Sequence, residues 1–477
     1  MKKSLYQIAL AAFLLPILAR GLFYYRGIAA RPEISTPDYA ALQAAPAPLK
    51  TPAAENKNRE STRGTVLFDA THGNQFTATE VAALSEAIAA HGGAVEFLSD
   101  SSALEYKLKY ASAFVVVSPS VTFYNEETRL IKDFTAQGGR LLVFTDATRG
   151  SVYENYISGV TKYYSDATPA NSLLTAFDIT VNDDYLYDLE RHDSNFRNVL
   201  FDQFGKAELV FGMKQAAFYG AHSLTTFSGT LLLQSAETTR SSIDDAHHPQ
   251  SGGAILSADG NALALGDFTF LSSPYDNMAD NAVFIKNIAD FALNGKRNVS
   301  LKNFPFVFQS PEAQVYLASD VTLSTEVIGA LSGAQSAFAA NGIALTLTDK
   351  IPTNGDVLVL ATFTPNEEIA PYLQPFDITL DDSELIQIPK LGDLGRYGSG
   401  LLLFQKSETG NTLLLLANSP EDLVSFVGVV ASGSLDACVL QGDLGVCSVG
   451  YGGEYNQGGG ATPEPALTPA PEVTPQG

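Results

Sequence analysis

From Thr65 onward the chain alternates short apolar runs with segments whose apolar residues recur at helical spacing. Three of the runs are Thr65–Asp69, Ala113–Pro119 and Arg140–Asp146, and the second is apolar almost without interruption. Continuous apolar strands are typical of parallel sheets, because helices cover both faces of such sheets. Strands and helices that alternate with short loops therefore predict an α/β domain built on a doubly wound parallel sheet.

Helical spacing predicts helices over residues 77–90, 125–136 and 280–293, and glycines follow each of them closely. Thr79 is the candidate N-cap of the first helix. The stretch from about residue 150 to residue 228 is polar and rich in loop-forming residues. Three apolar runs follow it, ending near Leu271. We therefore predict that residues 65–297 form one domain.

A second, smaller and degenerate α/β domain is predicted over residues 298–431. Its pattern is a strand at Gln314–Ala318, a helix at Thr325–Asn341 and a strand at Ala344–Leu347. Internal similarity favours a duplication, since AFDITVNDD at 176–184 matches PFDITLDDS at 375–383. Chance likeness between two α/β segments is the alternative.

The N-terminal residues 1–31 determine the expected compartment. Lys2 and Lys3 precede an apolar run that continues through aromatic residues to Tyr25, which is typical of a membrane anchor with interfacial aromatics. Cleavage as a signal peptide, followed by secretion, is the alternative. Either way we expect the body to be extracytoplasmic, and with a retained anchor the chain is a single-pass protein of the cell membrane.

Two segments have compositions that do not support a packed core. Residues 32–64 are rich in proline and alanine, which predicts a linker between the membrane and the body. Residues 450–477 are dominated by glycine and then by proline and threonine, which predicts a disordered tail.

The only two cysteines, Cys438 and Cys447, lie in the segment 432–449. Two thiols are too few for a zinc site made of cysteines alone, which needs four ligands. In an exported chain they are expected to form a short-loop disulfide, and two free thiols are the alternative.

The charge balance restricts the partners that the chain can bind. With 29 basic and 52 acidic residues, the formal net charge is -23. Nucleic acids and anionic lipid headgroups both require a basic face, so neither is an expected partner. The apolar share of 45% is ample for a large core.

Three tracts of the first domain resemble class I glutamine-amidotransferase-like proteins that have lost catalysis. They are VLFDATHGNQF, VVVSPSVTFYNEETRLIKDFTAQGGRLLVFTD and LALGDFTFLSSPYDNMADNAVFIKNIADFAL. The chain resembles an uncharacterised, N-terminally anchored group related to the auxiliary component of the gliding-motility ABC transporter and to the amidotransferase-like domain of intraflagellar transport proteins. The resemblance implies a flavodoxin-like sheet, a role at a membrane and no established chemistry.

An active amidotransferase needs a cysteine nucleophile in a tight turn between a strand and a helix. The first domain has no cysteine, and the corresponding turn reads Ser118-Pro119-Ser120. Because these serines lack flanking glycines, we expect no strained nucleophile turn there. The GxxxxGK loop that cradles phosphates is also missing. No catalytic residue, catalytic metal or cofactor is predicted.

The tract DATHGN, residues 69–74, is the strongest candidate for chemistry, because Asp and His three residues apart at a strand end occur in metal-dependent hydrolases. The alternative is a structural turn, in which Asp69 caps the loop, Gly73 adopts a positive φ and Asn74 binds the backbone. If a ligand binds, the carboxyl edge of the sheet is the expected place. The candidate ligand-binding residues are Asp69, Thr71, His72, Gly73, Asn74, Ser118, Thr145, Asp146 and Arg149.

Arg149 could hold a carboxylate or phosphate, and the alternatives are a solvated loop arginine or a salt bridge to Asp146. The leading functional hypothesis is a non-catalytic, membrane-tethered binding or scaffold protein that works with an unidentified membrane-protein partner, as an accessory component of a transporter-like assembly. A hydrolase that uses Asp69 and His72, and a small-molecule sensor that uses the strand-end pocket, are the alternatives.

Overall fold

The computed structural model describes residues 2–24, 64–155, 159–389 and 391–449. The predicted disordered tail and, apart from Gly64, the predicted linker lie outside these residues. Helix α1 (Lys2–Tyr24) belongs to one compact unit, and residues 58–477 belong to another. Each unit is therefore described by itself.

Helix α1 carries an apolar stretch from Lys3 to Phe23, with Pro16 inside it. At 1.5 Å per residue its 23 residues exceed the thickness of a bilayer core, which is about 30 Å. By length and composition it is the one helix of the described chain that could cross a membrane, and a signal sequence near the N-terminus would have the same properties.

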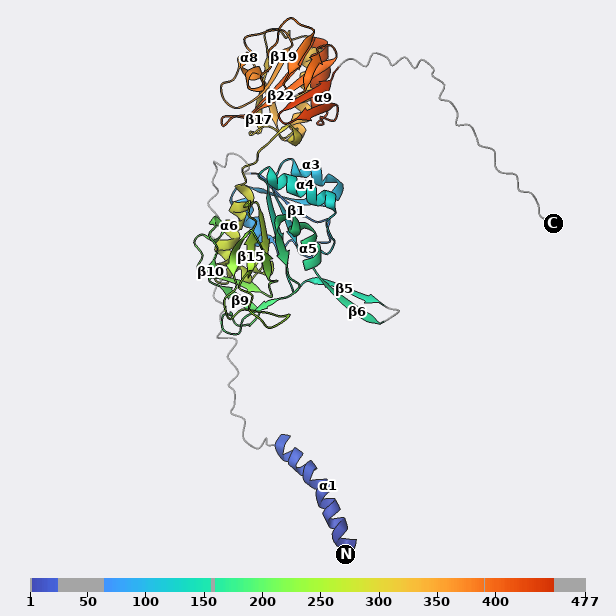
Figure 1. Cartoon of the computed structure of the whole chain (residues 1–477), viewed down its shortest axis with the longest axis vertical. Coiled ribbons are helices and arrows are strands. Elements are labelled where there is room, and N and C mark those ends of the chain that lie inside the picture. Colours follow the sequence, from blue (N-terminus) through green and yellow to red (C-terminus); the bar gives the residue numbers. More distant parts are fainter. Residues whose placement is uncertain (1, 25–63, 156–158, 390, 450–477) are drawn as a thin grey trace, which may run out of the picture. The chain divides into compact units, whose positions relative to one another are not determined.

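The first domain is built on a ten-stranded sheet (Figure 1). Five neighbouring strands are parallel. In spatial order they are β2 (Ala94–Leu98), β1 (Thr65–Asp69), β3 (Ala111–Val117), β4 (Arg140–Phe144) and β16 (Ala262–Leu265). This order, second-first-third-fourth-fifth along the chain, is that of flavodoxin-like folds, so the predicted fold class is confirmed.

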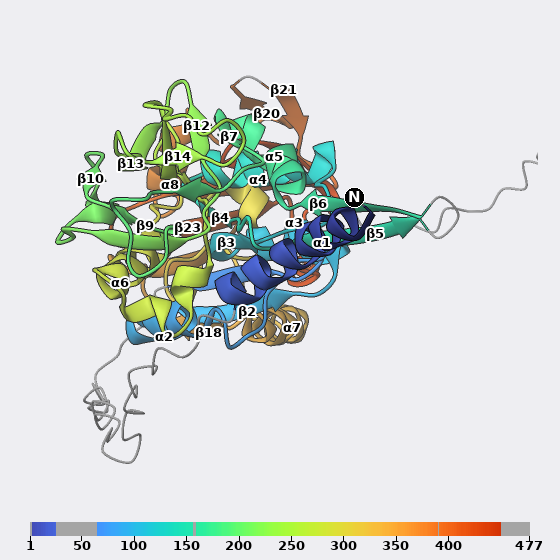
Figure 2. The same ribbon diagram turned by 90° about the horizontal axis from the view of Figure 1, so that it is seen from below.

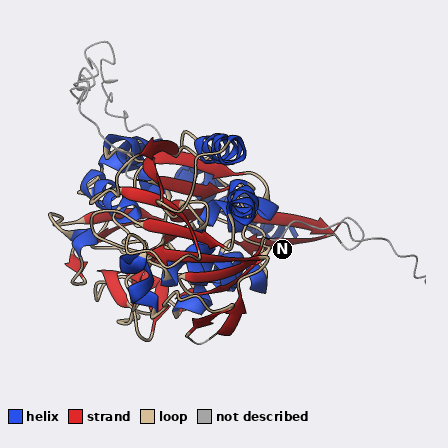
Figure 3. Ribbon diagram, turned by 90° about the horizontal axis from the view of Figure 1, so that it is seen from above, coloured by secondary structure: helices blue, strands red, loops and turns tan. Residues whose placement is uncertain are grey.

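Helices cover both faces of the parallel strands, as Figures 2 and 3 show. Helices α2 (Ala82–Ala90) and α6 (Asn281–Leu293) pack on one face with residues such as Ile88 and Phe284. Helices α3 (Leu104–Leu108), α4 (Asn125–Ala136) and α5 (Ala167–Leu174) pack on the other. Strand β3 is buried along its whole length, as expected for a strand covered on both faces.

The first predicted helix is shorter than its sequence pattern indicates. Helix α2 begins at Ala82, whereas the apolar spacing predicted a start at Thr77 with Thr79 as the cap. The backbone N–H and hydroxyl of Thr77 instead donate to the Glu80 carboxylate, at 2.8 and 2.9 Å, and close a turn before the helix. Local hydrogen bonding of this kind competes with the first helical turn.

The polar stretch of residues 150–228 contains short strands that the sequence analysis missed, whereas two of the five strands named next, at residues 230–234 and 251–256, coincide with apolar runs that it identified. Five antiparallel strands extend the main sheet: β7 (Ile179–Val181), β10 (Gln203–Phe204), β12 (Leu224–Thr226), β13 (Thr230–Gln234) and β15 (Ser251–Leu256). Two small sheets pair β8 (Leu186–Tyr187) with β14 (Arg240–Ser241) and β9 (Asn198–Phe201) with β11 (Ala216–Tyr219). Strands this short carry too little periodicity to be recognised.

A separate two-stranded hairpin follows β4. Its strands are β5 (Gly150–Asn155) and β6 (Val160–Ser165), and they pair only with each other. The hairpin extends away from the sheet of the first domain in both views (Figures 1 and 2).

The second domain has its own seven-stranded sheet and its own core. Its strands, in spatial order, are β18 (Ala344–Thr348), β17 (Glu312–Leu317), β19 (Asp356–Thr362), β23 (Thr412–Ala417), β22 (Ser399–Gln405), β25 (Leu444–Ser448) and β24 (Cys438–Gln441). Helices α7 (Thr325–Ala340) and α9 (Pro420–Ala431) cover one face. The short helix α8 (Ala370–Leu373) and the hairpin of β20 (Leu385–Ile388) and β21 (Gly392–Gly395) cover the other.

The two sheets share a local arrangement that agrees with the predicted duplication. In each, the second strand pairs with the first and the first with the third, all parallel. Asp178 and Asp377, which occupy the same place in the matched sequence tracts, both follow a 3-10 helix and adopt left-handed backbone conformations, with φ of 57° and 55°. The duplication itself stays a prediction.

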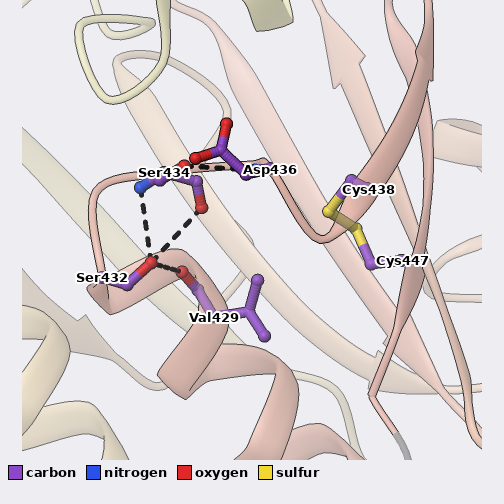
Figure 4. The surroundings of a disulfide bond; sticks show 6 residues. All are labelled: Val429, Ser432, Ser434, Asp436, Cys438 and Cys447. Atoms are coloured by element: carbon purple, nitrogen blue, oxygen red, sulfur yellow. Dashed lines mark hydrogen bonds between the residues drawn. A yellow bond between two sulfur atoms is a disulfide. The ribbon is translucent and has the colours of Figure 1, made fainter. Parts of the chain in front are cut away.

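The cysteine-containing segment is part of the second sheet, whereas the sequence analysis ended that domain at residue 431. Strand β25 pairs with β22, and β24 pairs with β25. Cys438 and Cys447 lie directly opposite each other in this hairpin and form a disulfide (Figure 4). The link therefore closes a loop at the outer edge of the sheet.

Candidate functional site

The carboxyl ends of β1, β3 and β4 bring the predicted site residues to one edge of the first sheet. The loop after β1 contacts the turn after β3, because the backbone N–H groups of Ser120 and Val121 donate to the His72 carbonyl, both at 3.0 Å. The Asn74 side chain also accepts a hydrogen bond from the Val117 N–H at 2.8 Å. The expected convergence of these two loops is therefore present.

Asp69 is fully buried at the end of β1 and organises its loop. One carboxylate oxygen accepts bonds from the N–H and hydroxyl of Thr71, at 2.9 and 2.7 Å. The other accepts from Asn74 at 2.7 Å and pairs with His72 at 2.8 Å. Gly73 has a φ of 59°, a left-handed backbone conformation that residues with a side chain rarely adopt. The loop thus has the geometry of the structural-turn alternative.

His72 lies between two carboxylates. Its Nδ1 is 2.8 Å from Asp69 and its Nε2 is 3.2 Å from Glu127, in the first turn of α4. The imidazole ring also stacks on Phe123, with 3.7 Å between the ring centroids. Glu127 accepts the Tyr124 N–H at 2.8 Å, so it caps α4 as well. The sequence analysis did not identify Glu127, whose only signal is its position three residues after Tyr124, the residue that precedes the helix.

Burial by itself would lower the pKa of His72, but the bonds and charges of Asp69 and Glu127 outweigh it and raise that pKa. Burial would raise the pKa of Asp69, and His72 and Thr71 reverse this to a net lowering. Both shifts favour an imidazolium between two carboxylates. A metal ion could bind a His72 nitrogen only if one of these ion pairs were broken.

Ser118 corrects one sequence-based prediction. Its backbone has a φ of 43°, so a strained turn forms after β3 despite the lack of glycine. Its N–H donates to the Phe144 carbonyl at 2.7 Å, and its carbonyl accepts from Gln75 at 3.0 Å. The Oγ is buried and has no hydrogen-bond partner in the described structure. Both His72 nitrogens face carboxylates, so in this arrangement His72 does not serve as a base for Ser118.

The third loop holds a separate, buried acidic cluster. Asp146 accepts from the N–H and hydroxyl of Thr148, at 2.8 and 2.5 Å, and from the Thr269 hydroxyl at 2.7 Å. Asp267, at the end of β16, accepts the N–H groups of Tyr219 and Thr269 at 2.8 and 2.7 Å. Thr145 lies beside this cluster and donates its hydroxyl to the Leu265 carbonyl at 3.0 Å.

Burial, and then the neighbouring Asp146 charge, raise the pKa of Asp267 far above its ordinary value. Burial also raises the pKa of Asp146. The pair therefore favours a state in which a proton reduces the repulsion between the two carboxyl groups. A third carboxylate, Asp166, accepts the Asp146 N–H at 2.9 Å and pairs with His222 at 2.9 Å.

One sequence-based alternative for Arg149 was a salt bridge to Asp146, and the structure shows a different partner. Its guanidinium forms an ion pair with Glu80 and lies 5.0 Å above the Phe268 ring. The sequence could not indicate this partner, because Glu80 lies 69 residues away.

The polar side chains at the strand ends are packed against one another. Five cavities of the described residues are lined by other parts of the body. The described residues also contain no group of three His, Cys, Asp or Glu side chains arranged to hold a metal ion.

These observations define an α/β protein of flavodoxin-like topology whose strand-end polar residues mainly bind one another. Profiles of known protein families do not match the chain, and no curated protein matches it in sequence. Several solved structures are similar to it, including the N-terminal domain of mmIFT52, with 16% identity over 49% of this chain and 99% of that one, and a TM-score of 0.39.

ThuA-like proteins are also among the structural neighbours. One from Bacteroides uniformis has 12% identity over 50% of this chain and 94% of its own, with a TM-score of 0.30. Another, from Parabacteroides merdae, has 10% identity over 49% and 90%, with a TM-score of 0.28. The relationship is distant, and the topology above carries the fold assignment by itself.

Proposed function

We propose that the chain is a non-catalytic binding or scaffold protein, held at a membrane by α1 with its body outside the cytoplasm, and that its partner is a membrane protein. The observation that carries the proposal is the hairpin of β5 and β6. Two-stranded hairpins are marginally stable in water unless another surface packs against them. This hairpin joins no other sheet of the described structure.

The hairpin exposes apolar and aromatic side chains. Val152 is 60% exposed, Val160 49%, Tyr163 57% and Tyr164 51%. Such side chains are enriched where proteins meet, since burying them in an interface removes apolar area from water. A partner that covers the hairpin would also provide the packing that an isolated hairpin lacks.

The polar edge of the first sheet supports a non-catalytic role. Asp69, His72 and Asn74 bind one another and the neighbouring turn. Asp146 binds two threonines, and Arg149 pairs with Glu80. These contacts stabilise the loops, whereas a catalytic group needs a free acceptor or donor that faces a substrate.

The test is a pull-down of the full-length protein from detergent-solubilised native membranes after mild crosslinking, with partners identified by mass spectrometry. We expect a reproducible membrane protein with the wild type and its loss with Val152→Ser/Val160→Ser/Tyr164→Ser. The matched control, Leu189→Ser/Phe211→Ser/Phe227→Ser, removes three exposed apolar side chains outside the hairpin. Recovery of the protein alone, or equal capture by both variants, would count against the proposal.

A further inference from the structure

The first domain contains a cavity of about 350 Å³ that the functions considered above do not use. It is lined by residues of α3, of α4 and of the segment 297–303 that follows α6. Lys109 lies just before β3, and Gln137 lies just before β4. Because these strands are parallel, the cavity lies at the edge of the sheet where they begin, and the candidate site lies at the edge where they end.

Basic side chains outnumber acidic ones in the lining, although the whole chain has a formal net charge of -23. The charged lining residues are Lys109, Arg129, Arg297 and Lys302, with Glu105 and Asp133 as the acidic ones. Arg129 pairs with Glu126 and, at 3.5 Å, with Asp133, and the charge of Glu105 also acts on it. Both acidic residues of the lining therefore act on Arg129. The other three cations form no ion pair with any described residue.

Arg297 is held in a fixed position without an acidic partner. Its Nη1 donates to the Ala111 carbonyl at 3.0 Å, and its Nη2 donates to the Leu108 carbonyl at 3.1 Å. The guanidinium also lies 4.6 Å from the centre of the Phe134 ring. Burial lowers the pKa of Arg297 to about 10, and no carboxylate offsets this effect. The contacts fix the guanidinium at the cavity wall and leave its charge unbalanced.

Two lysines and an amide add donors that have few partners. The Lys109 Nζ makes one hydrogen bond, to the Phe304 carbonyl at 3.3 Å. Lys302 is exposed, and neither its ammonium nor the Gln137 amide has a hydrogen-bond partner among the described residues. Ammonium and guanidinium groups form their strongest hydrogen bonds with carboxylates and phosphates. The free donors of this cavity therefore match an anionic ligand.

We infer that this cavity binds a small molecule with two or more phosphate or carboxylate groups, held by Lys109, Arg297 and Lys302. The volume lies within the range of small-molecule sites, which is about 300–1,000 Å³. Like charges that line one cavity repel each other, and an anion among them converts this repulsion into attraction. The site is separate from the hairpin of β5 and β6, so the inference does not rest on the proposed function.

Two segments of this chain outside the described residues are alternative occupants. Residues 25–63 contain six basic and four acidic residues, so they would add positive charge to a positive cavity. Residues 450–477 are acidic and follow β25, whose partner strand β24 contributes Leu440 to the lining. Their three glutamates, Glu454, Glu464 and Glu472, are at least eight residues apart, so one carboxylate at a time would face three cations. A compact ligand with several anionic groups balances the charges better.

The test is isothermal titration calorimetry of the full-length protein in a non-ionic detergent, with inorganic pyrophosphate and citrate as the probes. Sodium chloride keeps the ionic strength constant, so that general screening does not contribute. We expect at least one probe to bind saturably at one site per chain, and the one that binds distinguishes phosphate from carboxylate ligands. Lys109→Gln/Lys302→Gln should weaken this binding about tenfold, because two charge-assisted hydrogen bonds are lost.

The matched control, Lys132→Gln/Lys286→Gln, removes the same charge from two exposed helix positions outside the cavity and should leave binding unchanged. Lys302→Gln alone replaces an exposed lysine without a partner, so it should fold normally and weaken binding about threefold. No saturable binding of either probe, or equal weakening by the two double variants, would overturn the inference.

A further variant tests the C-terminal segment as the occupant. Glu454→Gln/Glu464→Gln/Glu472→Gln removes its three side-chain carboxylates in the full-length chain. Unchanged affinity for the probe supports a small-molecule site. A gain in affinity would show that this segment occupies the cavity, and it would overturn the assignment to a small molecule.

Discussion

The Ser118 side chain is the one polar group of the strand-end loops with a buried atom and no partner in the described structure. A buried hydroxyl without a hydrogen bond costs about 1–3 kcal/mol. Ser118→Ala should therefore stabilise the first domain by about 1 kcal/mol, measured by thermal unfolding. Ser120→Ala is the control, since it removes the 2.9 Å bond to the Gly73 carbonyl and should destabilise. Destabilisation by Ser118→Ala would mean that the hydroxyl has a partner.

His72 joins the loop after β1 to α4, so its removal leaves Asp69 buried without its cation. His72→Ala should lower the free energy of unfolding of the first domain by about 2–4 kcal/mol, judged by denaturant titration. His248→Ala is the control and should have little effect, because its side chain is exposed and pairs only with the exposed Asp244. Metal content, measured on the purified protein, should be the same in wild type and variant, and a loss of metal in the variant would favour the hydrolase alternative.

The contribution of His72 to the free energy of unfolding should fall as pH rises. Its folded pKa is raised, so the stabilisation is complete below the unfolded value of about 6.5 and is lost as pH rises through the folded pKa. The difference in unfolding free energy between wild type and His72→Ala should therefore shrink as pH increases above 6.5. A difference that stays constant between pH 6 and pH 9 would mean that the pKa of His72 is the same in the folded and unfolded states, and a difference that grows with pH would mean that folding lowers it.

At the scale of elements, the sequence predicted the strands and helices whose periodicity is strong. Helix α4 has its predicted bounds, and β3 was recognised from its apolar run, because burial on both faces leaves an unmistakable pattern. The strands between β5 and β12 were missed because they are short and partly exposed. The candidate site was predicted only in part. The loops after β1 and β3 meet at the predicted edge of the sheet. Glu127 and Glu80 were not identified as partners of His72 and Arg149, because contacts between distant segments leave no local signal in the sequence.

The disulfide gives a prediction for the hairpin of β24 and β25. Cys438 and Cys447 are separated by 9 residues, and closing so short a loop stabilises a fold by about 2–3 kcal/mol. Replacing both cysteines by serine should lower the stability of the second domain by that amount in denaturant. The control is Val439→Ser, at a 67% exposed position of the same hairpin. An unchanged midpoint would show that the hairpin unfolds independently of the sheet.

At the scale of the whole molecule, the two sheets enclose separate hydrophobic cores. We therefore expect calorimetry of the full-length protein to resolve two unfolding transitions. His72→Ala should lower only one of them, and the double cysteine variant only the other. A single transition that both variants shift would mean that the domains unfold as one cooperative unit.

The position of the disulfide also bears on how the protein behaves after synthesis. Strand β24 is the last strand of its sheet, with one side open to pairing by another chain. While the covalent link holds, this strand keeps its register against β25. In a reducing compartment the link would open and leave a loosened strand free to exchange or aggregate. If the body is exported, as we propose, the link favours molecules that have matured in an oxidising environment.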